Sequence, residues 1–392
     1  MIRFEGLDGL RGWLAWTVVL HHVLFFTGLG APWLPTGLVL QAGFLAVMVF
    51  IIVSGFVITH LVLEKDEPYR LYIARRALRI YPIYLLALLL GVAATFLAFR
   101  TFLTPEGVPD PSALATLPYP QVANLAYDNA TLHSGAYLTH LVLHLTMLHG
   151  LFAQTFLPDA EFMFLAPAWS LSLEWQFYLV APFVVRAARN KLLAIGLVAA
   201  TFALTWLYGH KVFGGWGLPS FLPGACLYFA VGIATRLLIP RDGFRFSWQA
   251  AVAPALLAIG FIAMGAWRLP VWVWLAFIAA SLAASRGGRL GEPVRRIVQA
   301  LFESRLATHL GKASYSTYLV HYPLMQIAMY LAVRVLALSP PAAAVFVAVG
   351  TLVSTWALSQ LTWRFVEQPF IAHGKRLRRA EPVDEPPVAR GA

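Results

Sequence analysis

The sequence predicts an all-α fold, a polytopic membrane bundle of about ten transmembrane helices with cytoplasmic N- and C-termini. Of its 392 residues, 59% are hydrophobic and only 12% are charged, and the mean hydropathy is +0.71. A soluble domain carries roughly 25% charged residues, so this composition indicates a membrane protein. In lipid a helix satisfies its own backbone hydrogen bonds. The sequence lacks the alternating apolar segments of about ten residues that are typical of a membrane barrel.

Ten apolar runs are long enough to cross a bilayer, which takes about 20 residues of helix. They cover residues 10–29, 37–63, 80–100, 168–186, 192–209, 218–237, 248–266, 270–285, 313–335 and 341–363. A further apolar stretch, 137–153, lies in a part of the chain (101–170) without Lys or Arg, as is typical of exported segments. We therefore expect residues 101–167 to form an extracytoplasmic insert whose apolar stretch does not span. Every strongly basic segment then falls on the cytoplasmic side.

Residues 1–371 are interpreted as one transmembrane domain, and residues 372–392 as a disordered cytoplasmic tail rich in Arg, Pro and Glu. The net charge of +11 does not indicate a nucleic-acid partner, because most basic residues lie in short loops between spans, where they report orientation. The single cysteine, Cys226, excludes an intrachain disulfide and is expected to pack between helices.

The first predicted span opens with Arg11 and carries His22 eleven residues later. At ~1.5 Å per residue the two side chains lie about 16 Å apart, half of the ~30 Å hydrocarbon thickness. Arg11 can therefore stay at a water boundary while His22 reaches mid-membrane, where an ionisable residue marks a functional site by default. The alternative is that His21 or His22 only bonds a carbonyl of a neighbouring helix.

A basic loop after the second span contains Arg75, Arg76 and Arg79, which would cluster near one side of a helix. Each guanidinium can bind oxygen atoms in pairs, so the cluster suits a phosphate-bearing ligand. The alternative is that these arginines anchor anionic lipid head groups and set the topology.

Two more ionisable residues reach the predicted membrane interior. Glu174 enters from the outer side to a depth of roughly 7–8 Å, where it could meet His22 and orient it as a general base. His321 lies near mid-membrane in the span 313–335. The alternatives are that Glu174 only ties helices together, and that the Ser and Tyr residues before His321 are interhelical hydrogen-bonding groups.

Three histidines of the insert raise the question of zinc, because His140 and His144 are spaced to share a helix face. No carboxylate accompanies them within the motif, and His149 falls on a different face. No metal site is therefore expected here.

Together these motifs resemble the acyltransferase-3 family, integral-membrane enzymes that acylate cell-surface carbohydrates and some small molecules. The motifs that carry the resemblance are Leu7-Asp-Gly-Leu-Arg11 followed by His22, Ser54-Gly-Phe56, Arg75-Arg76-x-x-Arg79-Ile-Tyr-Pro, Trp169-Ser-Leu-Ser-Leu-Glu174, Ser314-Tyr-Ser-x-Tyr-Leu-x-His321 and Phe365-Val-Glu367. They follow one another along almost the whole chain, so they are specific for the family and much less specific for the substrate.

The resemblance implies an acyl group, usually acetyl, that is taken from acyl-CoA at the cytoplasmic face and delivered to a glycan hydroxyl. The family's Arg-x10-His motif falls on Arg11 and His22, and its Arg-x-x-Arg motif falls on Arg76 and Arg79. It also implies a multi-pass protein of a bacterial inner membrane.

We therefore expect a membrane O-acyltransferase that uses acetyl-CoA as co-substrate and a carbohydrate or lipid-linked glycan as acceptor, without a metal. The residues expected to bind the CoA phosphates are Arg11, Arg75, Arg76 and Arg79. The expected catalytic residues are His22, Glu174 and His321, with His22 as general base or as acyl-carrying nucleophile. The alternative is a proton-coupled transporter or flippase in which the same three catalytic residues form a proton relay. That alternative leaves the arginine cluster unexplained unless the cargo is a phosphate.

Overall fold

The computed structural model describes residues 6–29, 36–65, 67–132, 135–239, 268–286 and 288–377. Throughout these residues the regular structure is helical, apart from one isolated antiparallel bridge between Leu103 and Pro109. The prediction of an all-α fold is confirmed for this part of the chain.

Helices occupy nine of the ten predicted spans, and the tenth, 248–266, lies outside the described residues. The nine are α1 (Gly6–Thr27), α2 (Thr36–Glu64), α3 (Tyr69–Phe102), α7 (Trp169–Ala187), α8 (Lys191–Gly209), α9 (Cys226–Leu238), α11 (Leu269–Arg286), α14 (Ser314–Tyr330) and α15 (Pro340–Thr362). Among the described residues, four helices are long and apolar enough to cross a membrane, by length and composition. These four are Gln41–Glu64, Tyr69–Phe102, Lys191–Gly209 and Pro340–Arg376.

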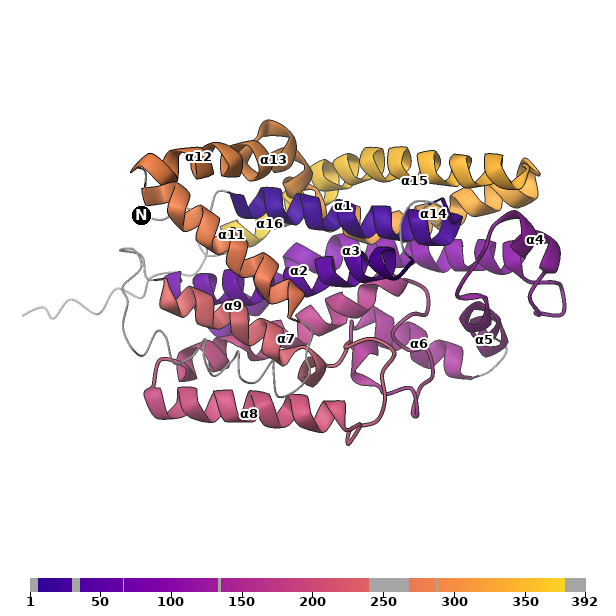
Figure 1. Cartoon of the computed structure of the whole chain (residues 1–392). Coiled ribbons are helices and arrows are strands. Elements are labelled where there is room, and N and C mark those ends of the chain that lie inside the picture. Colours follow the sequence, from indigo (N-terminus) through magenta and orange to yellow (C-terminus); the bar gives the residue numbers. More distant parts are fainter. Residues whose placement is uncertain are drawn as a thin grey trace, which may run out of the picture.

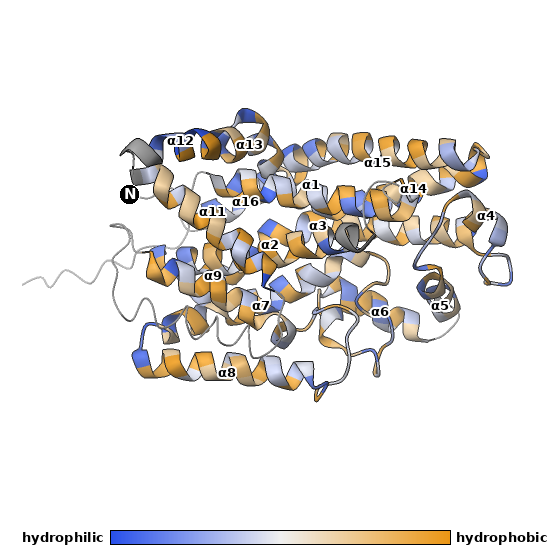
Figure 2. Ribbon diagram, in the orientation of Figure 1, coloured by the Kyte–Doolittle hydropathy of each residue, from blue (hydrophilic) through white to orange (hydrophobic). Residues whose placement is uncertain are grey.

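The long helices lie side by side, and the insert covers one end of the bundle (Figure 1). The insert contains α4 (Pro111–Thr116), α5 (Val122–Leu132) and α6 (Ala136–Leu145). Towards the other end lie α12 (Gly288–Val298) and α13 (Arg305–Lys312), where hydrophilic residues are concentrated, whereas α8 and α15 are hydrophobic along most of their length (Figure 2).

Two predicted boundaries are wrong. The predicted span 218–237 begins later, at Cys226, because Pro219 and Pro223 cannot donate helical hydrogen bonds. The basic loop that contains the arginine cluster is instead the first part of the continuous helix α3, which begins at Tyr69. Helix α16 (Gln368–Arg376) includes the first residues of the predicted tail, and the disorder of that tail stays a prediction because residues 378–392 lie outside the described part of the chain.

Helix α6 has ten residues and therefore a length of about 15 Å, half the thickness of the hydrocarbon. That the apolar stretch 137–153 does not span stays a prediction.

Glycines set the position of α1 against α13. A Cβ atom on Gly12 would lie 2.7 Å from the backbone nitrogen of Gly311, and one on Gly311 would lie 2.0 Å from the carbonyl oxygen of Asp8. Only glycine allows two backbones to approach this closely. The Asp-Gly-Leu-Arg-Gly run thus packs the start of α1 tightly and fixes the place from which Arg11 extends.

Candidate active site

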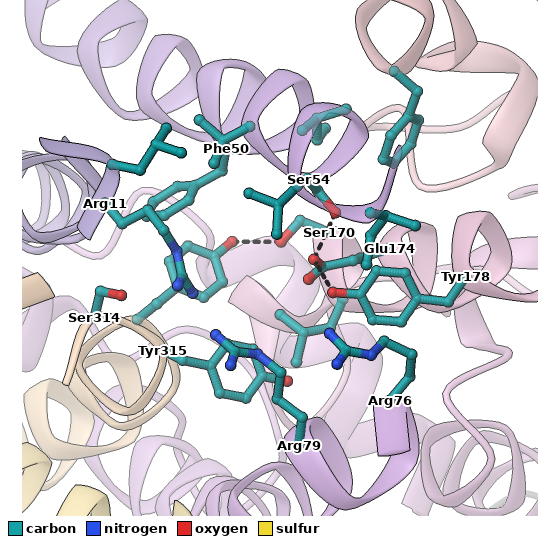
Figure 3. Close-up of a pocket in the computed structure, with 18 of the residues that line it drawn as sticks. Arg11, Phe50, Ser54, Arg76, Arg79, Ser170, Glu174, Tyr178, Ser314 and Tyr315 are labelled. Carbon is teal, nitrogen blue, oxygen red and sulfur yellow. Dashed lines mark hydrogen bonds between the residues drawn. The ribbon is translucent and has the colours of Figure 1, made fainter. Parts of the chain in front are cut away.

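A cavity of about 460 Å³ lies between α1, α2, α3, α7 and α14, and we call it the arginine cavity (Figure 3). Its polar lining residues are Asp8, Arg11, Ser54, His60, Arg76, Arg79, Ser170, Glu174, Tyr178, Ser314, Tyr315 and Tyr318. Side chains of α2, including Val47, Phe50 and Ile51, supply an apolar wall. The cavity therefore combines cationic and apolar surface in a volume that is typical of small-molecule sites.

The arginines of this cavity carry uncompensated positive charge. Neither Arg76 nor Arg79 forms an ion pair within the described ranges, and the Nε atom of Arg76 is buried without a hydrogen-bond partner there. Arg11 is only 4.0 Å from Asp8, at the limit of an ion pair. Guanidinium groups in this state suit an anion with several oxygen atoms.

Arg75 is not among the lining residues of the arginine cavity. It forms a short ion pair with Glu67, and its Nε donates to the carbonyl oxygen of Gly374 at 3.0 Å. Both charged side chains are buried, with 9% and 5% of their surfaces exposed. The expected cluster of three neighbouring arginines is therefore reduced to Arg76 and Arg79, and Arg11 joins them from α1.

Glu174 also lines the arginine cavity, rather than contacting His22 as the sequence suggested. Its Oε1 accepts a hydrogen bond from Ser54 Oγ at 2.8 Å and another from the Tyr178 hydroxyl (Figure 3). The single negative charge of this carboxylate offsets only part of the charge of the three guanidinium groups.

A second cavity, of about 280 Å³, lies beside the first, and we call it the histidine cavity. Most of its wall is aromatic or imidazole, from His21, His22, Phe25, Phe26, Phe44, Phe162, Trp169, Tyr318 and Tyr322. Gln121 of the insert adds an amide. Flat aromatic faces with few polar groups suit a ligand that stacks and is then oriented by a few hydrogen bonds.

His22 is held in one orientation by two contacts of its Nδ1 atom. Nδ1 lies 3.0 Å from the carbonyl oxygen of Val18 and 3.1 Å from Nε2 of His321. A carbonyl oxygen only accepts, so Nδ1 carries the proton and Nε2 of His22 is left unprotonated and basic. His321 is fully buried, and it takes the orienting role that the sequence assigned to Glu174.

The two cavities are next to each other, and individual side chains line both of them. Val47 and Tyr318 line both of them. The Tyr318 hydroxyl donates to the carbonyl oxygen of Pro167 at 2.9 Å and lies 2.8 Å from Ser170 Oγ. Arg11 in the first cavity and His22 in the second extend from the same helix, so α1 connects the two sites.

The sequence model of the acyltransferase-3 family, which is described as an acyltransferase domain, matches residues 4–360 of the chain. The chain belongs to the acyltransferase-3 family. Its relatives include the peptidoglycan O-acetyltransferase OatA of Listeria monocytogenes, which is 25% identical over 94% of this chain and 56% of that protein. The O-acetyltransferase OatA of Staphylococcus aureus is 25% identical over 94% of this chain and 57% of its own length.

The chain thus spans just over half the length of these two relatives. Acyltransferase MdmB of Streptomyces mycarofaciens is 24% identical over 82% of this chain and 79% of that protein. No solved structure matches the chain. In this acyltransferase-3 protein, Arg11, Arg76 and Arg79 line one cavity and His22 lines the adjoining one.

Sequence reasoning missed Glu161, which shapes the histidine cavity. This buried carboxylate accepts hydrogen bonds from the backbone nitrogens of Gly217 and Leu218, at 2.6 and 3.1 Å, and from Ser220 Oγ at 2.8 Å. Gly217 and Leu218 line the histidine cavity. No periodicity or motif marks Glu161, because these three partners lie more than 50 residues away; a fourth donor, Gln154 Nε2, is close in sequence and lies 3.0 Å from Oε1.

The three histidines of the insert and Cys226 line neither cavity. His140, His144 and His149 are fully buried, and the rings of His144 and His149 stack with centroids 4.1 Å apart. Within the described residues no group of three or more His, Cys, Asp or Glu side chains is arranged to hold a metal. Cys226 Sγ lies 3.1 Å from Thr205 Oγ1 and so packs α9 against α8.

Proposed function

We propose that the chain is a membrane O-acyltransferase that moves an acyl group, most simply acetyl, from acyl-CoA to a hydroxyl of a cell-envelope or exported carbohydrate. One observation carries the proposal. A cationic cavity and an aromatic cavity with an oriented imidazole adjoin at Val47 and Tyr318. A reaction between two chemically different substrates needs such a pair of sites, with the reacting groups meeting at the shared wall.

The arginine cavity is proposed as the donor site. Arg11, Arg76 and Arg79 bind the phosphate oxygens of acyl-CoA, because Asp8 and Glu174 compensate only part of their charge. The apolar wall from α2 accommodates the pantetheine arm. This arrangement directs the thioester towards Ser170 and Tyr318, away from the arginines.

The histidine cavity is proposed as the acceptor site. Sugar rings have apolar faces that stack on aromatic side chains, and their hydroxyls can reach Gln121 and His22. One relative is named a peptidoglycan O-acetyltransferase, which supports a carbohydrate or lipid-linked glycan as the acceptor. The lipid bilayer is a further proposed partner, because the apolar helices of the bundle that holds both cavities are expected to lie in it.

In the proposed reaction, Nε2 of His22 removes the proton of the acceptor hydroxyl as the oxygen attacks the thioester carbonyl carbon. The new carbon–oxygen bond forms, the carbon–sulfur bond breaks, and the proton on His22 passes to the sulfur, so that CoA leaves as the thiol. His321 accepts the hydrogen bond from Nδ1 and stabilises the imidazolium that forms on His22. The Ser170 hydroxyl lies at the junction, 2.8 Å from the Tyr318 hydroxyl, and can donate to the oxyanion, whereas the Tyr318 proton is held by the Pro167 carbonyl. In a relay through an acyl-histidine, the same Nε2 would attack the thioester first.

We further propose ten spans, cytoplasmic termini and a location in the inner membrane. The basic segments then face the cytoplasm, as the positive-inside rule requires. The start of α3 with Arg76 and Arg79 lies on the side where acyl-CoA is available, and the insert lies on the far side.

The alternative of a proton-coupled transporter requires His22, Glu174 and His321 in one relay. Glu174 instead binds Ser54 and Tyr178 in the arginine cavity, whereas the two histidines pair beside the other cavity. This separation favours the acyltransferase.

The test is transfer of label from [14C]acetyl-CoA to envelope glycans by the purified full chain in lipid vesicles. We expect label in the glycan with wild type, labelling at least about 10²-fold slower with His22→Gln, and no label with Arg76→Ala/Arg79→Ala. Label retained on the protein after an acid quench would indicate an acyl-histidine. If folded wild type transfers no acyl group from any acyl-CoA, the proposal is wrong.

A further inference from the structure

Two buried carboxyl groups of the insert line one small cavity that adjoins the histidine cavity. Asp128 on α5 and Asp159 in the loop before α7 are only 7% and 4% exposed, and both line this cavity. Oδ1 of Asp128 and Oδ2 of Asp159 have no hydrogen-bond partner within the described residues. Two buried acids with unpartnered oxygens are stabilised either by a bound cation or by a shared proton.

A third unpartnered oxygen comes from a distant helix. Gln326 on α14 is 3% exposed, and its Nε2 donates to the Tyr119 hydroxyl at 3.3 Å. Its Oε1 lacks a partner among the residues that the structure describes. This amide oxygen is independent of the two acids, because it belongs to the helix that also carries His321.

All three residues line the same cavity, which has a volume of about 20 Å³. The other lining side chains that bear oxygen are Thr95, Tyr119, Gln121, Asn124 and Tyr322. The Asn124 amide is already used, since it donates to the other oxygen of Asp159 at 2.7 Å. The space holds a single atom and not a sugar or an acyl chain, because one water alone needs about 10–15 Å³.

We propose that Asp128, Asp159 and Gln326 bind a calcium ion in this cavity. Every available ligand is a hard oxygen atom, and two carboxylates match a divalent charge. Magnesium usually keeps several of its waters, for which the cavity has no room. Zinc prefers nitrogen and sulfur ligands, and no imidazole or thiol lines this cavity.

The ion would join three segments that are remote in sequence: α5, the loop at Asp159, and α14. The small cavity shares Gln121, Phe162, Ala166 and Tyr322 with the histidine cavity. Calcium would therefore fix the outer wall of the acceptor site. Only this last consequence rests on the proposed function, because binding of the ion itself requires no acyl transfer.

The test is 45Ca2+ equilibrium dialysis of the full chain in detergent, with thermal unfolding measured in CaCl2 and in EGTA, both without acyl-CoA. We expect one saturable site per chain and an unfolding temperature raised by roughly 2–6 °C in calcium. Asp159→Asn should abolish both effects, and Gln326→Leu should weaken binding about tenfold. Glu106→Gln removes an exposed acid of the same insert and should change neither.

Three results would overturn the proposal. The first is folded wild type that binds no 45Ca2+, and the second is Asp159→Asn that binds calcium as tightly as wild type. The third is an unfolding temperature that responds to acid alone and not to calcium, which indicates a shared proton. If Asp159→Asn does not fold, the wild-type isotherm and the Gln326→Leu variant decide. A calcium result stands whether or not the acyl-transfer assay succeeds.

Discussion

Nδ1 of His22 on α1 lies 3.1 Å from Nε2 of His321 on α14. The ring centroids are 5.0 Å apart, and the Val18 carbonyl oxygen contacts the same Nδ1 atom at 3.0 Å. Two helices thus hold one imidazole so that its other nitrogen, Nε2, is basic. In the proposed reaction this pair is the general base together with the group that orients it.

Replacing His22 tests this assignment. His22→Gln should lower the rate of acyl transfer by about 10²–10⁴-fold, the usual contribution of general base catalysis, and leave acetyl-CoA binding unchanged. His321→Gln should lower kcat less, because its amide can still accept from Nδ1. The measurement is kcat with [14C]acetyl-CoA. A His22→Gln enzyme with wild-type kcat would show that another group is the base.

Residue counts along a helix predicted the depth of a side chain but not its direction around the helix. Glu174 and His22 reach similar depths by count, yet Glu174 lies in the arginine cavity and His22 pairs with His321. Direction depends on which helices pack together, and α1 packs against α14 through contacts between parts of the chain about 300 residues apart.

For the arginines of α3, too, helical spacing did not predict the direction of every side chain. The sequence grouped three arginines of α3 by helical spacing, and two of them do line one cavity. The third, Arg75, is held by Glu67 and by the carbonyl of Gly374, a residue 299 positions later. Glu161, Asp128 and Asp159 belong to an irregular insert, where no periodicity indicates which side chains are buried.

Arg75 and Arg70 form a matched pair for a stability test, because both are arginines at the start of α3. Arg75→Ala leaves Glu67 buried without its partner and should destabilise the protein by about 3–5 kcal/mol. Arg70 is exposed, so Arg70→Ala should change stability by less than about 0.5 kcal/mol. Denaturation in detergent measures both. Equal stability of the two variants would contradict the buried ion pair.

Closing the shared wall should separate donor binding from transfer. Val47→Phe adds bulk to a side chain that lines both cavities, so the acyl group should no longer reach His22. We expect acetyl-CoA affinity within about threefold of wild type and transfer lowered by at least about 10²-fold. Leu61→Phe, which enlarges a residue of the arginine cavity alone, serves as the control. Full activity in Val47→Phe would mean that the acyl group takes another route.

Removing the Glu161 carboxylate should loosen the outer wall of the histidine cavity. Glu161→Ala leaves the amides of Gly217 and Leu218 and the Ser220 hydroxyl without their acceptor, at a cost of about 3 kcal/mol. The unfolding temperature should fall, and in active preparations KM for the acceptor should rise more than KM for acyl-CoA. A rise confined to acyl-CoA would place the acceptor elsewhere.

Acid should weaken one contact of the insert. Hydrogen bonds from Ser112 and from Arg334 lower the pKa of Asp110 to about 2. The folded state therefore favours the carboxylate, and this stabilisation is complete above about pH 4–5 and is lost as the pH falls towards 2. Asp110→Asn keeps the helix-capping oxygen but removes the charge. The fall in unfolding temperature between pH 5 and pH 2.5 should be smaller in the variant than in wild type.

The most direct test of the central claim is isothermal titration of acetyl-CoA into the detergent-purified protein. Wild type and His22→Gln should both bind, because the donor site is the arginine cavity and not the imidazole. In Arg76→Ala/Arg79→Ala binding should be lost, and in Arg70→Ala it should be retained. Failure of well-folded wild type to bind any acyl-CoA, or unchanged binding in the double variant, would contradict the donor site proposed for this chain.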